Sequence, residues 1–246
     1  MIKLLIALVT FYMAYLPMTY ASPIVADLSN YRIHMDSSFN GTRMFLFGAR
    51  NDNGDVVVVI RGPEKNYIVR KKEPFMGIWV NSERMKFFNV PDYYVIASSR
   101  PLEEIMEFGS FRKLSIGMQH LTTPTIGSRN TEKFQNFSNA FLAYQKSRSL
   151  YRADLEPISF MGETLFKTVV PFPDNIPSGE YTAEIYLLSE GDIIGMQSTP
   201  IQVMKTGIDA FVYQAAHQYP FLYGISAIII ALSAGWLGSR LFERKT

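Results

Sequence analysis

Two short segments of the sequence place a histidine near a methionine, a combination that can bind a soft metal ion. His34 precedes Met35, and Met118 lies two residues before His120. Imidazole nitrogen and thioether sulfur together suit copper. The sequence has no Cys, no His-x-x-x-His spacing and no methionine-rich run. Packed methionines and surface histidines are therefore the favoured interpretation, and a metal site formed by these four residues is the alternative.

The patterns of catalytic chemistry are missing from the sequence. A hydrolytic triad needs a nucleophile, a histidine base and an acid that orients the base, but no Gly-x-Ser-x-Gly elbow accompanies the three histidines. The third histidine, His217, lies beside a long apolar stretch. The glycine next to Arg61 lacks the spacing of a phosphate-binding loop, and without Cys there is no thiol nucleophile. We therefore expect no enzymatic activity and no cofactor.

A polar and aromatic segment, residues 56–101, is the most unusual part of the sequence. Aromatic and arginine side chains often dominate protein contact surfaces. The candidates for such a surface are Arg61, Trp79, Asn81, Tyr93 and Arg100. Turn residues combined with aromatic core residues explain the same composition equally well. The sequence does not separate these two interpretations.

The charges are divided unequally along the chain, although the formal net charge is only +2. Residues 28–100 contain eleven Lys and Arg against seven Asp and Glu, whereas residues 156–218 contain two against eight. The two segments either attract each other within one domain or face partners of opposite charge. The longest basic run is Arg70-Lys71-Lys72, so nucleic-acid binding is not expected.

Residues 1–21 have the pattern of a signal peptide. Lys3 gives a positive start, residues 4–16 form an apolar run, and the small residues Thr19 and Ala21 suit signal peptidase, with Ser22 as the first mature residue. The pattern predicts that the following residues are exported. An uncleaved N-terminal anchor is the alternative.

Residues 219–239 predict a single transmembrane helix. The stretch has no charged side chain and is long enough to cross a hydrocarbon core of about 30 Å. Tyr219, Tyr223 and Trp236 lie near its ends, where aromatic rings favour the headgroup region. Residues 240–246 contain three basic residues against one acidic residue, so this tail is expected in the cytoplasm and the preceding domain outside. A buried core helix is the alternative, but such helices rarely run so long without a charge.

The predicted transmembrane helix contains a ridge of small residues. Ala227, Ala231, Gly235 and Ser239 recur at every fourth position. Small side chains on one ridge let another helix approach closely. The ridge predicts packing against another integral membrane protein or a second copy of the chain, and the alternative is the general abundance of small residues in membrane helices.

The residues between the two ends predict a mainly β fold. Apolar and alternating runs predict strands at 31–39, 41–49, 56–60, 67–70, 77–81, 86–90, 93–97, 158–160, 165–170, 181–188, 193–196 and 201–204. Residues 56–60 are apolar throughout, which is typical of a strand covered on both faces. Gly179 and Tyr181 match the tyrosine corner of immunoglobulin-like sandwiches, in which the phenol binds an upstream backbone group. We predict an immunoglobulin-like β-sandwich spanning residues 22–205.

Helical patterns interrupt this sandwich at about residues 101–152. Residues 98–104 have the cap candidates, the proline and the acidic residues of a helix start. Aromatic residues follow three-and-four spacing between Thr131 and Tyr151, so this helix is expected to pack on the sheet as a lid. Residues 206–218 predict a juxtamembrane helix that leads into the membrane.

Five segments are distinctive in combination: VVVVIRGP, GIWVN, VPDYYVIASSRPL, LFKTVVPFPDNIPSGEYTAEIYLL and YGISAIIIALSAGWLG. Together they resemble the alphaproteobacterial putative transmembrane protein family over nearly the whole mature chain. The resemblance implies a Gram-negative inner-membrane protein with a periplasmic domain. It implies no reaction and no catalytic residues.

The leading hypothesis is a non-enzymatic, membrane-anchored periplasmic module that supports a membrane partner, such as a transporter or a respiratory complex. The partners expected are the lipid bilayer and another integral membrane protein or a second copy of the chain. The alternative hypothesis is a periplasmic metal- or small-ligand-binding protein that uses His34, Met35, Met118 and His120.

Overall fold

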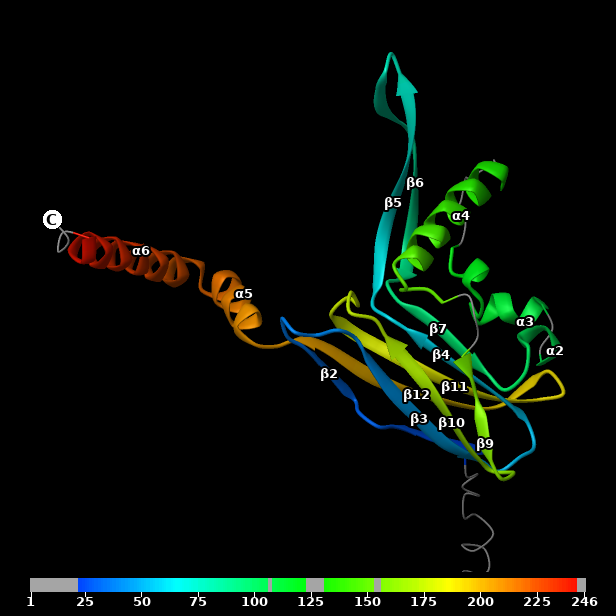
Figure 1. Cartoon of the computed structure of the whole chain (residues 1–246). Helices are drawn as coiled ribbons and strands as arrows, with labels where there is room; N and C mark the ends of the chain where they lie inside the picture. Colours follow the sequence, from blue (N-terminus) through cyan, green and yellow to red (C-terminus); the bar gives the residue numbers. More distant parts are fainter. Residues whose placement is uncertain (1–21, 106–107, 123–130, 153–155, 243–246) are drawn as a thin grey trace, which may run out of the picture.

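A computed structural model describes residues 22–105, 108–122, 131–152 and 156–242. The signal peptide predicted at 1–21 and residues 243–246 of the predicted tail lie outside the described residues. The described chain forms two β-sheets, a group of helices, a two-stranded projection and a C-terminal pair of helices (Figure 1). The prediction of a mainly β fold is confirmed.

The two larger sheets face each other and share one core. The four-stranded sheet is antiparallel and has the order β1 (Ile24–Leu28), β3 (Thr42–Arg50), β10 (Leu165–Phe172), β9 (Ser159–Met161). The six-stranded sheet has the order β2 (Arg32–Met35), β12 (Asp192–Lys205), β11 (Gly179–Ser189), β4 (Asp55–Arg61), β7 (Tyr94–Ser98), β8 (Glu156–Pro157). Its two edge pairs, β2–β12 and β7–β8, are parallel.

Successive strands β2 and β3 belong to different sheets. The sequence suggested two strands joined by a short turn, but β2 pairs with β12 and β3 pairs with β1 and β10. Gly41 lies between them with φ 88°, and a Cβ there would meet the Phe172 carbonyl oxygen at 2.8 Å. Glycine therefore lets the chain cross from one sheet to the other where other residues would clash.

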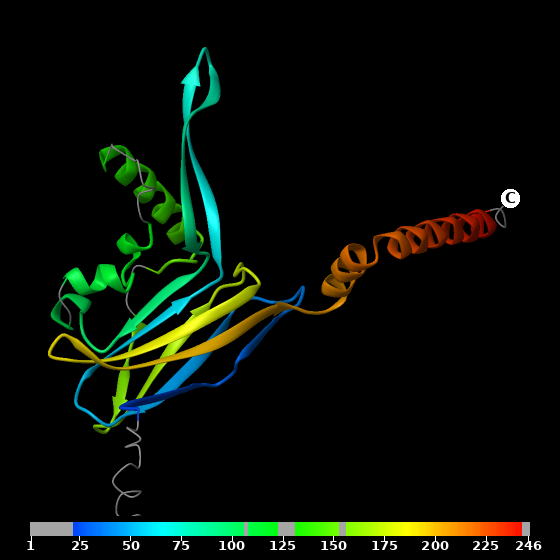
Figure 2. The same cartoon turned by 180° about the vertical axis from the view of Figure 1, so that it is seen from behind.

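Strand β4 is buried on both faces, as its apolar run predicted. All residues from Val56 to Ile60 are buried, and so are all those of the neighbouring strand β7. The four-stranded sheet covers one face of these strands, and the helices between β7 and β8 cover the other (Figures 1 and 2). The core of the domain is therefore three layers deep at this point.

The helical insertion is confirmed between β7 and β8, in shorter pieces than the sequence suggested. The pieces are α2 (Leu102–Ile105), α3 (Phe108–Lys113), the 3-10 turn η1 (Met118–His120) and α4 (Thr131–Ser147). The Tyr94 hydroxyl of β7 accepts a hydrogen bond from the Gly117 amide at 2.9 Å. Burial raises the pKa of Tyr94 to about 12, so the phenol stays protonated where it holds the insertion to the sheet.

Strands β5 (Glu64–Phe75) and β6 (Ile78–Pro91) form a long hairpin that projects from the domain beside α4 (Figure 1). We call this hairpin the arm. The sequence suggested short strands interrupted at Pro74, and this was wrong. Pro74 lies opposite Trp79 in an isolated ribbon, where each strand has one free edge and a missing amide is tolerated. Met76 and Gly77, at φ 48° and 82°, form the two-residue turn.

The hydrogen bond predicted for Tyr181 is present. Its hydroxyl donates to the Pro177 carbonyl oxygen at 2.6 Å. The buried ring lies 5.7 Å from that of Tyr93 and 6.0 Å from that of Phe172, measured between centroids. This contact closes the end of the sandwich from which the arm leaves. The immunoglobulin-like class of the sandwich stays a prediction.

The C-terminal helices α5 (Ile208–Gln218) and α6 (Pro220–Phe242) extend away from the sandwich (Figures 1 and 2). Residues 220–240 are long and apolar enough to cross a membrane, and none of them is buried against the rest of the described chain. A core helix of a soluble domain would be mostly buried. The structure therefore agrees with the single transmembrane helix predicted at 219–239.

Candidate functional site

The four candidate metal ligands lie on two separate elements. His34 and Met35 are on the edge strand β2, whereas Met118 and His120 are in η1, beside β7. Three strands separate β2 from β7 in the sheet order, which at about 4.8 Å per step puts them about 19 Å apart. The structure does not bring these residues into one site, and no group of three or more His, Cys, Asp or Glu in the described chain is arranged to hold a metal ion.

The five candidate contact residues are also dispersed, because Tyr93 and Arg61 belong to the domain interior. Tyr93 is fully buried and stacks on Phe172 at 5.3 Å between centroids. Arg61 is half-buried, pairs with Glu184 at 3.1 Å, and donates to the Leu114 carbonyl at 2.9 Å. Both were wrong as surface candidates, because Tyr93 packs among the rings of the sandwich core and the Arg61 side chain is held between β11 and the helical insertion.

Arg100 lies on the surface but in a structural ion pair. Its Nε donates to Asp55 Oδ1 at 2.9 Å, and a terminal nitrogen contacts the other carboxylate oxygen. Ser99 donates to the same carboxylate at 2.9 Å. The Arg100 hydrogen bond holds the pKa of Asp55 below its usual value. This pair joins the start of β4 to the end of β7, at the end of β4 that is remote from the arm.

The remaining two candidates, Trp79 and Asn81, lie together near the tip of the arm. Four large apolar side chains surround the turn and all are exposed: Phe75, Met76, Ile78 and Trp79. The Met76 side chain is 90% exposed and Trp79 is 70% exposed. No element of the described chain covers them. We call these four residues the tip.

The base of the arm is held by aromatic packing against α4. The ring of Phe141 lies 4.9 Å from that of Tyr67 and 5.5 Å from that of Phe87, between centroids. Phe134, two helical turns earlier, meets Phe87 at 5.9 Å between centroids. Phe87 is 1% exposed. The aromatic stripe of the predicted lid therefore does pack inward, but against the arm.

A buried carboxylate also fixes the base of the arm. Asp92 immediately follows β6, is almost fully buried, accepts a hydrogen bond from the Tyr67 hydroxyl and pairs with Lys65. The Gln145 amide of α4 donates to the same Tyr67 hydroxyl at 3.3 Å. Because β5, β6 and α4 all contribute to this network, the direction in which the arm leaves the domain is fixed by several contacts.

The arm carries basic side chains between base and tip. Arg70 and Arg84 are directly paired across the two strands, although like charges opposite each other destabilise a sheet. Lys72 lies two residues from Arg70 toward the tip, and Lys86 lies two residues from Arg84 toward the base. None of the four forms an ion pair within the described residues. We call Arg70, Lys72, Arg84 and Lys86 the collar.

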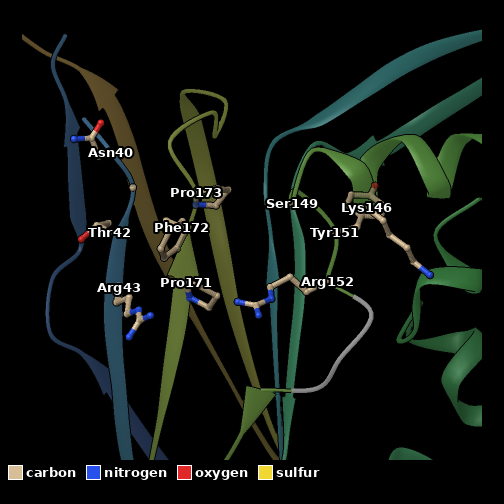
Figure 3. A pocket seen from close by; sticks show the side chains of 11 residues that line it. Asn40, Thr42, Arg43, Lys146, Ser149, Tyr151, Arg152, Pro171, Phe172 and Pro173 are labelled. Atoms are coloured by element: carbon tan, nitrogen blue, oxygen red, sulfur yellow. The ribbon is translucent and has the colours of Figure 1, made fainter. Parts of the chain in front are cut away.

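A second surface feature is a basic pocket of about 610 Å³ at one end of the sandwich, between the ends of β3 and β10 and the residues that follow α4. Figure 3 shows the side chains of Arg43 and Arg152 directed toward each other from opposite sides of Pro171, while the Lys146 amine points away. Arg152 also pairs with Glu156 at 2.8 Å. Two converging guanidinium groups can bind a small carboxylate or phosphate. No pattern in the sequence predicted this pair, because the two arginines are far apart in the chain and no local signal connects them.

The ridge of small residues on α6 is uncovered. A Cβ added at Gly235 would have no neighbour within 4 Å apart from the helix's own backbone. The helix pairs with α5 at its start and with no sandwich strand. The predicted packing face is therefore available to another helix.

The sequence also matches a protein-family model over most of its length. The model described as "Putative transmembrane protein (Alph_Pro_TM)" matches residues 23–244, nearly the whole chain. The chain belongs to this family. The matched residues include the sandwich, its arm and the C-terminal helix, so the family model describes all of these parts together. No curated protein matches the chain.

Proposed function

We propose that the chain is a membrane-anchored interaction module without catalytic activity, which uses the arm as its contact surface and works with an integral membrane partner such as a transporter or a respiratory complex. The observation that carries this proposal is the tip: four large apolar side chains exposed at the end of a projection whose base is firmly packed. Exposed apolar clusters on a folded protein mark interaction sites.

The proposed location is the periplasmic side of a bacterial inner membrane, with the C-terminus in the cytoplasm. The basic residues that follow α6 support this orientation through the positive-inside rule, and the signal-peptide pattern supports it independently. Reporter enzymes fused after Thr246 test it. A reporter active only in the cytoplasm is expected to work there, and activity of a periplasm-specific reporter would contradict the orientation.

Site-specific photo-crosslinking in native membranes tests the contact surface. A photoreactive phenylalanine analogue replaces Trp79 at the tip or, as a matched control, Tyr144, an exposed aromatic residue of α4. We expect an adduct from the tip and none from Tyr144. A tip that gives no adduct with protein or lipid would contradict the proposed use of the arm.

The α6 ridge offers a second test of the membrane partner. Gly235→Leu fills the open ridge, whereas Leu232→Ala changes a residue outside it. In mild detergent, Gly235→Leu is expected to lose a co-purifying membrane protein or a second copy that wild type and Leu232→Ala retain. A wild-type chain that always runs alone would count against the partner.

Small-anion binding is the second candidate function, favoured by the converging Arg43 and Arg152. Calorimetric titration of the full chain with inorganic phosphate and with acetate tests it. Binding that is lost in Arg43→Gln but retained in Lys146→Gln, whose amine points away, would support the pocket. Equal binding in all three proteins would exclude it.

A further inference from the structure

We propose that the tip of the arm inserts into the headgroup region of the same lipid bilayer that holds α6, with the collar contacting anionic lipids. This inference rests on the proposed use of the arm as a contact surface, and it names the partner of that surface.

The composition of the tip fits a membrane interface. Trp79 and Phe75 bring aromatic rings, and Met76 and Ile78 bring apolar side chains, all exposed around a two-residue turn. Aromatic residues favour the headgroup region of a bilayer, and apolar side chains can enter it to about 5–10 Å. The tip contains no charged residue, so nothing in it opposes shallow insertion.

The collar supplies the charge complementarity. Lys72 lies three residues before Phe75, and Arg70 five residues before it, which places them about 10–17 Å behind the tip at about 3.3 Å per residue. Basic side chains at that depth behind an inserted segment meet the phosphate groups of anionic lipids. The unpaired, directly opposed Arg70 and Arg84 repel each other in the isolated chain. An anionic surface removes that repulsion, whereas a neutral or basic partner would not.

The anchor makes this contact intramolecular. The arm has a 12-residue strand β5, so it is about 40 Å long. Helix α6 keeps the domain within that reach of one membrane, which raises the effective concentration of bilayer around the tip. A tip of four residues is too small to hold a free protein tightly on a membrane. Because α6 already holds this chain at the bilayer, the tip needs to supply only a small part of the free energy of membrane binding.

For the tip to reach the membrane that α6 crosses, the domain must rotate relative to α6 at the short link between β12 and α5. The arm is directed across the line of α6 in Figure 1. The chain passes from β12 to α5 through Thr206 and Gly207, and Gly207 has φ 94°. The Thr206 amide donates to the Met35 carbonyl of β2 at 2.8 Å, so the link turns at Gly207. Because the sandwich and α6 do not pack on each other, rotation at Gly207 brings the tip to the membrane surface without breaking the core.

Trp79 provides a direct probe, because the chain has only two tryptophans. Trp236→Phe leaves Trp79 as the single fluorophore in the full-length protein. The protein is placed, one copy per disc, in lipid nanodiscs of phosphatidylcholine alone or mixed with phosphatidylglycerol, with or without brominated acyl chains. In the anionic discs we expect the Trp79 emission to be blue-shifted, since the indole lies at the interface. We also expect the brominated lipid to quench about half of the emission intensity.

Two variants test the separate contributions of tip and collar in the Trp236→Phe background. Arg70→Gln with Arg84→Gln is expected to abolish the difference between anionic and neutral discs. It removes a repulsive pair, so loss of folding does not explain the result. Phe75→Ser with Ile78→Ser is expected to return Trp79 emission to that of a water-exposed indole in both discs.

A matched control moves the fluorophore to α4. Tyr144→Trp combined with Trp79→Phe and Trp236→Phe places the single indole on an exposed position of the domain. Its emission should respond to aqueous acrylamide and not to brominated lipid. Lipid quenching at Tyr144→Trp equal to that at Trp79 would overturn the specific role of the tip.

Two results for Trp79 would overturn the bilayer proposal. Full acrylamide quenching without lipid quenching in anionic discs would show that the tip stays in water. If the native-membrane crosslink from Trp79 is to a protein while the discs give no lipid quenching, the bilayer inference fails and the proposed interaction module stands. If neither experiment gives a contact, both fail.

Discussion

The base and the tip of the arm are both rich in aromatic side chains, but they differ in what surrounds them. Phe87 at the base is enclosed by the rings of Phe134 and Phe141, whereas Trp79 at the tip contacts no ring of another described residue. The same residue types therefore do two different things within one hairpin. At the base they contribute folding free energy, and at the tip they are left available for a partner.

The largest loss of stability is expected from the base. Phe141→Ala removes a buried ring that contacts both Tyr67 and Phe87, and should lower the free energy of unfolding by about 3–5 kcal/mol. Denaturant unfolding of the full chain in detergent, followed by circular dichroism, measures this. Tyr144→Ala on the exposed face of the same helix is the control and should cost about 0.5 kcal/mol or less. Equal costs would mean that α4 does not support the arm.

A smaller loss is expected from the buried carboxylate below the arm. Asp92→Asn weakens its contacts with Tyr67 and Lys65, and should cost about 1–3 kcal/mol. Tyr67→Phe removes the shared hydroxyl and should cost about 1 kcal/mol. Because the two side chains are in contact, the double variant should lose less than the sum of the two. Strict additivity in the same unfolding measurement would show that they do not act as one network.

The Asp55–Arg100 pair is expected to make only a small contribution to stability, because Arg100 is exposed to solvent and the attraction is screened by water. A double-mutant cycle with Asp55→Asn and Arg100→Gln measures it. The pKa of Asp55 is lowered in the folded protein, so the contribution is present above the usual pKa of 3.8 and is lost as the pH falls through the lowered value. A coupling energy that persists after Asp55 is protonated would contradict the assignment to this ion pair. The pair is remote from the arm, so photo-crosslinking from Trp79 should be unchanged.

The smallest effect on stability is expected at the tip itself. Trp79→Ser replaces an exposed side chain and should change the unfolding free energy by about 0.5 kcal/mol or less. If a large loss of stability accompanied it, the tip would be packed against the protein and could not serve as a free contact surface. Together with Phe141→Ala, this variant separates the two roles of the arm.

The features that the sequence predicted correctly are those with a strong local pattern. A stretch without charge predicted α6, a continuous apolar run predicted the double burial of β4, and one Gly-x-Tyr sequence predicted the Tyr181 hydrogen bond. In each case a few adjacent residues suffice, since the constraint is length, burial or a single turn.

The arm could not be recognised from the same kind of local pattern. Its strands mix charged and apolar residues, as a ribbon exposed on several sides allows, and Pro74 looked like an interruption. The available signal was Gly77 between two strands of similar composition, because glycine adopts the positive φ that a tight hairpin turn requires. Tyr93 was misplaced for a related reason: residue type alone does not show which aromatic rings are buried, and Tyr93 packs against Phe172 and Tyr181 inside the sandwich.

The arm is a ribbon of two strands, so β5 and β6 each keep one edge whose backbone amides and carbonyls have no strand partner. Free edges of this kind invite pairing with another copy, which in a crowded membrane leads toward aggregation. The arm carries two irregularities in its register, near Lys65 and between Lys71 and Lys72, and lysines and arginines line its length. Bulges twist an edge out of line and positive charges repel an approaching copy. The charges of the collar are thus also expected to keep neighbouring arms from joining into a continuous sheet.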